Sequence, residues 1–175
     1  MLNNVKDELN RFAKYVVTQS RANLTRGKKN TSKELYNSLE GVVKVSKNSF
    51  QLSFLMEDYG VFQDKGVSGT EEKYNTKFSY KQSSNVVGME YHTGVFSKWA
   101  KTRNIRLRDE KGRFKKGNYK SIGIVIAKSV KRKGIKPSLF FTKPFEKAFT
   151  NLDDKIIEAY KLDIETLLES SINNK

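Results

Sequence analysis

Two long helices are predicted at the ends of the chain, because apolar residues recur there every three or four positions. From Val5 to Leu24 they are separated by Lys, Arg and other polar residues, so a helix over about residues 3–24 would bury one face. A similar apolar stripe runs from Phe145 to Leu168, over about six turns. Proline is tolerated only near the start of a helix, so Pro144 places the start of the C-terminal helix close to Thr142.

A short helix and a hairpin are expected after the first long helix. Thr31 and Glu34 have the spacing of a capping box, which predicts a helix over about residues 31–40 that ends at Gly41. From Val43 to Met56 the apolar period changes to two, with a polar turn at residues 47–49. This alternation predicts a β-hairpin with one buried face. A short helical turn over about residues 58–65, stopped by Gly66, is expected next.

The middle of the chain is predicted to leave the compact part of the fold. Residues 67–96 are rich in Ser, Thr, Asn, Gly and Tyr without a sustained period, which is typical of a long loop or excursion. A short helix is expected at about residues 96–103. Residues 106–117, with two glycines and dense charge, are typical of a hairpin tip or exposed loop. Apolar residues then return to helical spacing, which predicts a helix over residues 119–133.

These elements predict one α+β domain spanning residues 1–175. A small antiparallel sheet would pack against the long N-terminal and C-terminal helices, with a loop and a basic arm inserted at about residues 67–118. The length suits one core, and 37% of the residues are hydrophobic. Cysteine is absent, which excludes disulfides, thiolate metal sites and thiol nucleophiles. No apolar run approaches the ~18 residues of a membrane span, so we expect a protein made in the cytosol, with no membrane partner.

Positive charge is concentrated in one segment. Residues 97–136 hold fifteen Lys and Arg against two acids, a balance of +13 in a chain whose total is +15. A single sign of charge concentrated in this way points to a polyanion or an acidic protein surface as partner. Three interpretations stay open: a solvated surface, a nucleic-acid contact, or an ion-pairing surface for an acidic subunit. The candidate contact residues are Lys98, Lys101, Arg103, Arg106, Arg108, Lys111, Arg113, Lys115, Lys116, Lys131, Arg132 and Lys133.

The sequence offers no pattern that reads bases. Without a helix-turn-helix signal, any DNA contact would be made to phosphates, and it would be independent of sequence and sensitive to salt. Aromatic residues before and within the basic segment could stack on bases, but they lack the order of a known single-strand module, so core or interface packing accounts for them better. The candidate subunit-interface residues are Tyr74, Phe78, Tyr80, Tyr91, Phe96 and Trp99.

Catalytic patterns are missing from the sequence. His92 is the only histidine and no serine stands in a Gly-x-Ser-x-Gly elbow, so neither a catalytic relay nor a histidine metal site is indicated. No glycine-rich phosphate loop is present. Acidic residues at positions 57, 58 and 64, or at 153 and 154, leave a magnesium-dependent nuclease as a formal alternative. We expect no enzymatic activity, no metal and no cofactor.

Several strings of the chain occur in an order that matches a known pattern. They are the opening helix, residues 27–39, residues 57–66 after the second strand, and residues 134–137, which lead through 143–145 into the terminal helix. Together they cover roughly 100 residues. In these features the chain resembles the head-to-tail joining or tail-completion (neck) proteins of tailed double-stranded-DNA bacteriophages.

The resemblance implies a structural virion protein of the head-tail junction or tail, assembled in the host cytoplasm. It implies a homo-oligomeric ring of about six or twelve copies, with portal or adaptor proteins and tail proteins as partners. Such a subunit has no active site. The long insertion departs from the compact family pattern, so neck, tail-terminator and other connector functions stay open.

A ring that repeats one heterologous contact needs two different, complementary patches on each copy. We expect one patch on the first and last helices and the hairpin, and the other on residues 67–99. The alternative function is a nonspecific double-stranded-DNA-binding protein that acts through residues 97–136. An enzyme is the third possibility.

Overall fold

The computed structural model describes residues 3–29, 31–46, 49–115 and 117–173, with side chains as far as residue 169 in the last helix. The described residues form eight helices and four short strands, which confirms the predicted α+β class. Their contacts fall into two groups, which we call the terminal unit (residues 1–60 and 139–175) and the middle unit (residues 61–138). The organisation as one domain with an insertion at about residues 67–118 stays a prediction.

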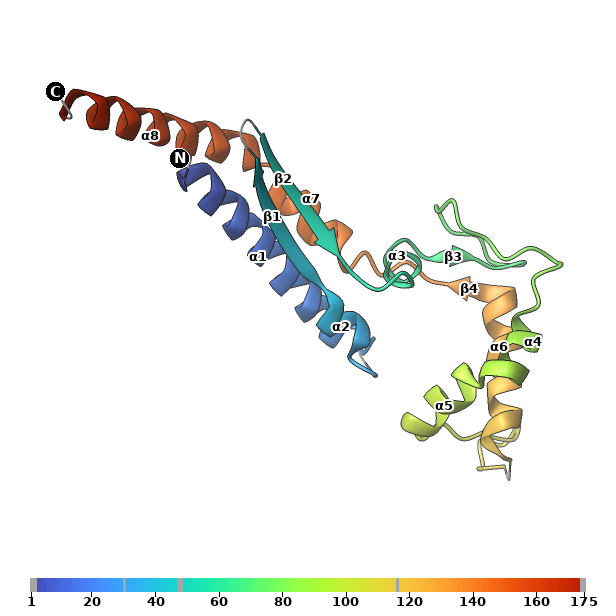
Figure 1. Cartoon of the computed structure of the whole chain (residues 1–175). Coiled ribbons are helices and arrows are strands. Elements are labelled where there is room, and N and C mark those ends of the chain that lie inside the picture. Colours follow the sequence, from blue (N-terminus) through green and yellow to red (C-terminus); the bar gives the residue numbers. More distant parts are fainter. Residues whose placement is uncertain (1–2, 30, 47–48, 116, 174–175) are drawn as a thin grey trace. The chain divides into compact units, whose positions relative to one another are not determined.

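The terminal unit is built from two long helices and a hairpin (Figure 1). Helix α1 spans Asn3–Arg26, and the antiparallel strands β1 and β2 span Glu40–Ser46 and Ser49–Leu55. Helices α7 (Thr142–Phe149) and α8 (Leu152–Asn173) complete the unit. Both α7 and α8 contact α1, and α1 also contacts both strands. This arrangement confirms a small antiparallel sheet packed on long N-terminal and C-terminal helices.

One face of the hairpin carries the predicted apolar row. Val43 pairs with Leu52 and Gly41 pairs with Phe54, so these side chains share one side of the ribbon. The ring of Phe54 lies edge-on to Phe12 of α1, at 6.2 Å between centroids, and it meets two phenylalanines of the α7 segment at 5.2 and 5.9 Å. Both outer edges of this two-stranded sheet lack a strand partner among the described residues.

The second helix is shorter than predicted and begins differently. Helix α2 spans Glu34–Ser38, and its N-cap residue is Lys33, in a left-handed conformation with no side-chain capping bond. The expected capping box at Thr31 is therefore wrong. The hydroxyl of Tyr59 accepts a hydrogen bond from the backbone N–H of Leu35 at 3.1 Å, so a residue distant in sequence supplies the partner that a local cap would have supplied.

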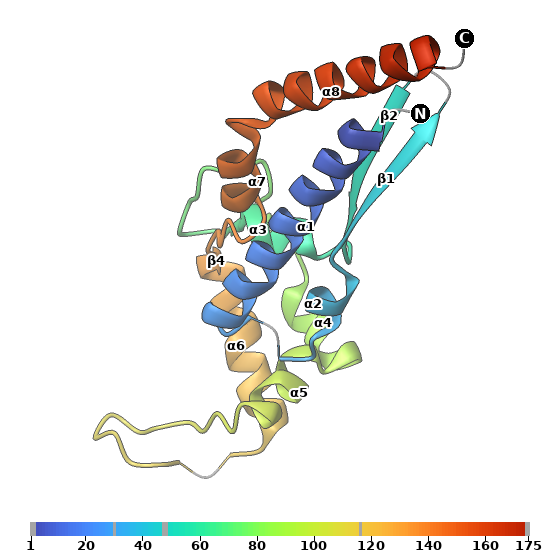
Figure 2. The same cartoon turned by 90° about the vertical axis from the view of Figure 1, so that its left-hand side faces the viewer.

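The C-terminal helix begins at Thr142 as predicted, but it is not continuous. A turn at Thr150 and Asn151 separates α7 from α8. The hydroxyl of Thr150 donates to the carbonyl oxygen of Glu146 at 3.1 Å, and this kind of bond competes with continued helix. The break allows α7 to pack its phenylalanines on the hairpin while α8 takes its own course along α1 (Figure 2).

A buried carboxylate joins the two long helices. Asp163 of α8 is only 4% exposed, and its oxygens accept hydrogen bonds from the backbone N–H groups of Asn4 and Val5 at 3.0 and 3.1 Å. These are among the donors that the start of a helix leaves without intrahelical partners. Burial by itself raises the pKa of Asp163, but the hydrogen bonds from the start of α1 outweigh it and leave this pKa below its usual value.

The described residues of the middle unit form four helices and a minimal sheet of two short strands. After α3 (Gly60–Lys65), strand β3 (Val67–Ser68) pairs antiparallel with β4 (Gly134–Ile135). Helices α4 (Val86–Thr93) and α5 (Val95–Thr102) both pack against α6 (Tyr119–Lys133). The prediction for α6 is confirmed residue for residue, and the short turn expected at 58–65 is confirmed as α3, with Gly66 at φ +76°.

Helix α4 contradicts the prediction of a long loop over residues 67–96. Its ends are defined by caps: Asn85 accepts a hydrogen bond from the N–H of Gly88 at 2.8 Å, and Gly94 ends the helix in a left-handed conformation. Glu90 of α4 is 3% exposed and accepts hydrogen bonds from the backbone N–H groups of Phe96 and Ser97 at 2.8 and 2.9 Å. A carboxylate from α4 therefore caps the start of α5.

We predict that replacing Asp163 by alanine destabilises the terminal unit, because the start of α1 loses its acceptor. At pH 7 the free energy of unfolding, measured with urea, should fall by about 1 kcal/mol, whereas the exposed neighbour variant Lys161→Ala should change it little. Because the folded-state pKa of Asp163 is lowered, its stabilising contribution is present above about pH 4 and is lost as the pH falls through the folded-state pKa. A difference between wild type and variant that grows on acidification would contradict this assignment.

Candidate interaction surfaces

The predicted basic hairpin tip exists and is organised by one carboxylate. We call residues 103–117 the basic arm; they join α5 to α6 and project from these helices (Figure 2). Asp109 accepts hydrogen bonds from the backbone N–H groups of Lys111 and Arg113 at 3.0 and 2.8 Å, and its other oxygen faces Nε of Arg113 at 3.0 Å. Gly112, at φ +77°, completes the reversal. The arm is thus a defined turn.

Two arginines of the arm share one exposed ring. The guanidinium carbons of Arg106 and Arg108 lie 5.7 and 4.4 Å from the centroid of Phe114, within the range of cation–π attraction. Phe114 itself is 62% exposed. Arg108 also donates a hydrogen bond to the carbonyl oxygen of Gly112 at 2.8 Å. These contacts fix the directions of the two cations and leave an aromatic surface open to a partner.

A hollow of about 420 Å³ lies at the base of the arm. Its walls combine apolar side chains with two cations. The lining residues are Ile105, Arg106, Leu107, Phe114, Lys115, Gly117, Tyr119 and Ile122. The arm therefore offers both positive charge and an apolar depression within one stretch of chain.

The predicted cations at the end of α6 are engaged within the middle unit. Arg132 makes two hydrogen bonds to the Glu71 carboxylate, at 2.7 and 3.0 Å, and these bonds lower the pKa of Glu71. Lys133 faces Glu72 at 4.0 Å, and Lys131 donates to the carbonyl oxygen of Gln82 at 2.6 Å. The other predicted cations that the structure describes are exposed, and Lys116 lies outside the described residues. Arg132 and Lys133 are exposed as well, but each faces an acid, and most of the exposed cations of this set lie on the arm and α5.

The predicted interface aromatics divide into two groups. Tyr74, Phe78 and Tyr80 are half-buried, and Phe78 lies edge-on to Phe62 with 4.8 Å between centroids. Phe96 is also half-buried, whereas Tyr91 and Trp99 are exposed on α4 and α5. Met89 of α4 and Val95 of α5 are exposed as well. The interface candidates from the sequence were aromatic residues only and therefore did not include these two.

Helix α8 carries exposed apolar residues that the sequence stripe assigned to the buried face. Its packed positions are Leu152, Ile156, Ala159 and Asp163, which are buried or half-buried. A second face, which we call the apolar row, consists of Ile157, Tyr160, Ile164 and Leu168, all between 39% and 59% exposed. A third face, the acidic row, consists of Asp154, Glu158, Glu165 and Glu169, all exposed. Spacings of three, four or seven residues place each row on one side of the helix.

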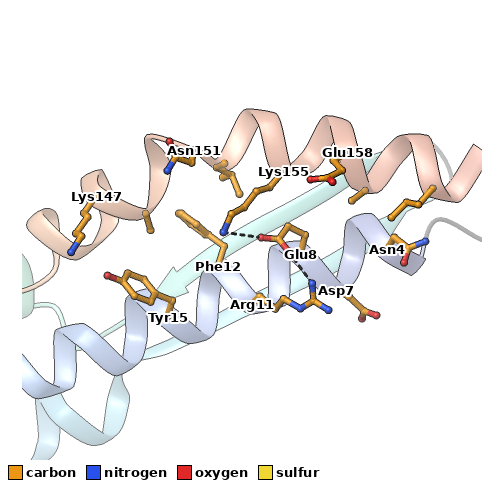
Figure 3. Close-up of a pocket in the computed structure, with 14 residues that line it drawn as sticks. Asn4, Asp7, Glu8, Arg11, Phe12, Tyr15, Lys147, Asn151, Lys155 and Glu158 are labelled. Carbon is orange, nitrogen blue, oxygen red and sulfur yellow. Dashed lines mark hydrogen bonds and ion pairs between the residues drawn. The ribbon is translucent and has the colours of Figure 1, made fainter.

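A groove of about 790 Å³ runs between α1 and the α7–α8 segment (Figure 3). Glu8 stands at its centre, paired with Lys155 at 3.6 Å and with Arg11 at 3.2 Å. Phe12 and Tyr15 form part of its wall. Its lining contains no serine, threonine or histidine. The Lys155–Glu8 pair crosses the groove and joins α8 to α1, whereas the Arg11–Glu8 pair lies within α1, so these charges describe a contact between packed helices.

Other candidate chemistry is scattered. His92 lies exposed on α4, and the described residues include no group of three or more His, Asp and Glu placed to hold a metal ion. Of the acids weighed for a magnesium site, Asp64 is buried in α3, whereas Asp153 and Asp154 occupy the first turn of α8.

None of the described helices combines the length and apolar character needed to cross a membrane. Comparison with protein-family models, curated proteins and solved structures finds no match to this chain.

We predict that Asp109→Ala loosens the basic arm without affecting the stability of either unit. Losing the turn's acceptor costs about 1 kcal/mol locally, so trypsin should cleave within the arm about fivefold faster, since proteolysis follows the population of the open form. The thermal unfolding midpoint should stay unchanged. Glu110→Ala, which removes an equal charge from the adjacent residue, is the matched control. Equal cleavage rates in the two variants would show that Asp109 does not order the turn.

Proposed function

We propose that this protein is a ring-forming structural subunit of the head-to-tail junction or tail of a tailed bacteriophage. The proposal combines the sequence resemblance with the surfaces described above. The observation that carries it is the apolar row of α8, because four large apolar side chains at consecutive turns of one helix remain exposed. Contiguous exposed apolar surface of this kind marks a protein interaction site.

Two further features support assembly as the function. The β1–β2 ribbon leaves its outer edges without strand partners among the described residues, and an open edge is a template for pairing with another chain. A second group of exposed apolar residues, on α4 and α5, belongs to the other unit. Two unlike surfaces on one copy are what a closed ring with a repeated heterologous contact requires.

A nonspecific double-stranded-DNA-binding protein is the second candidate. The observation in its favour is the row of exposed cations on the basic arm, whose arginines are pre-oriented by Phe114. Contacts of these groups to phosphates would be insensitive to sequence, and their affinity would decrease log-linearly with salt.

We predict that the full chain forms a closed oligomer with one dominant copy number, about six or twelve, in native mass spectrometry. Replacing Ile164 and Leu168 by aspartate should weaken self-association at least about tenfold, because charge enters the apolar contact. Thr166→Asp adds the same side chain to another face of α8 and serves as the control. A monomer that binds short duplexes tightly at low salt would favour the second candidate, and a ladder of all sizes would argue against a closed ring.

A further inference from the structure

Helix α8 and the basic arm are complementary in both charge and apolar character. We propose that the acidic and apolar rows of α8 in one copy dock onto the basic arm, with its hollow, in a second copy of this chain. This inference rests on the ring-forming function proposed above and names the two faces that would meet.

Charge is the first argument. Helix α8 contains six acids and two lysines, whereas residues 97–136 contain fifteen Lys and Arg and two acids. The four side chains of the acidic row are exposed, and so are the arm's lysines that the structure describes. The most negative helix of the chain and its most positive segment thus belong to different units, and both face solvent. Opposite potentials of this kind steer association and fix its register.

Apolar shape is the second argument. On α8 the apolar row lies beside the acidic row, about 100° around the helix axis, with Lys161 between the two. At the base of the arm, apolar walls from Ile105, Leu107 and Ile122 are accompanied by the cations of Arg106 and Lys115. A helix that inserts its apolar row into this hollow would bring its acids toward those cations, which is the helix-in-groove mode of recognition.

Accessibility is the third argument. Asp163 holds the first residues of α1, so the part of α8 beyond it, residues 164–173, continues past the start of α1 (Figure 1). Ile164 and Leu168 lie on this extension, as do Glu165 and Glu169. Half of each row is thus presented on a part of the helix that α1 does not accompany.

Duplex DNA fits the arm less well than α8 does. A phosphate backbone would satisfy the cations, but it offers no apolar group to cover Phe114 or to fill the hollow beside it. The α8 surface supplies both kinds of partner at once. Because each copy carries one α8 and one arm, the contact is head-to-tail, and it can repeat until a ring closes.

Three charge variants test the proposal on the full chain. An α8 variant carries Glu158→Lys, Glu165→Lys and Glu169→Lys, and an arm variant carries Arg106→Glu, Lys111→Glu and Lys115→Glu. The control carries Lys28→Glu, Lys33→Glu and Lys143→Glu, three exposed cations of the terminal unit that lie outside the hairpin and α8. Circular dichroism verifies folding, and a milder α8 variant with glutamine at the same three positions guards against misfolding. Self-association is measured by native mass spectrometry and sedimentation.

We expect each reversed variant alone to lose at least about tenfold in self-association affinity, the glutamine variant to lose less, and the control to match wild type. Mixed in equal amounts, the α8 and arm variants should assemble again, because each mutated face now meets a face of opposite charge on the other variant. Such assemblies must alternate, so they should contain the two variants in equal numbers and only even copy numbers.

Three results would distinguish a failure of the ring-forming function from a failure of the contact between α8 and the arm. Wild type that remains monomeric at all concentrations would overturn the ring function and this inference with it. Wild type that oligomerises, with reversed variants that assemble as well as the control, would overturn the inference alone. An arm variant that assembles normally but no longer retains duplex DNA would reassign the arm to nucleic acid.

Discussion

A two-stranded antiparallel ribbon is barely stable in water by itself, so the terminal unit depends on what covers the hydrophobic face of β1 and β2. The cover is a set of phenylalanine rings at the crossing of α1, α7 and the hairpin, with Phe54 at its centre. Phe54 meets the other rings edge-on, a geometry in which a ring edge faces another ring's π surface. Gly41 permits the close approach, because a Cβ there would come within 2.8 Å of the Ala13 side chain.

Both units use a buried carboxylate to join elements that are separate in sequence. Asp163 caps α1 from 158 residues away, and Glu90 caps α5 from α4. The cap that Glu90 provides also requires glycine at position 123 of α6. Gly123 faces Glu90 and Ser97 so closely that any side chain there would displace them. A buried acid without donors would be costly; here the helix starts supply the donors, so the cost of burial is offset by a contact that fixes helix positions.

Local patterns could predict most of the longer elements, and long-range contacts explain where the predictions were wrong. Helix α1, the hairpin and α6 follow from apolar spacing alone. Helix α4 lacks that spacing and is defined by caps at Asn85 and Gly94, signals present in the sequence but weak without their partners. The burial of Asp163, between apolar residues of α8, could not be anticipated, since only the position of α1 makes an acid favourable there. For the same reason, the stripe on α8 predicted burial of side chains that the structure leaves exposed.

Charge segregation along the chain has a physical consequence for any assembly. If copies met through like surfaces, the +13 segment of one would approach the same segment of the next, and the repulsion would have to be screened or neutralised by an anion. A head-to-tail contact would remove this problem, because the positive segment of each copy would meet a negative helix. Apolar contact at the same place would exclude water and strengthen the ion pairs. The apolar contact would then supply affinity, and the ion pairs would fix the register.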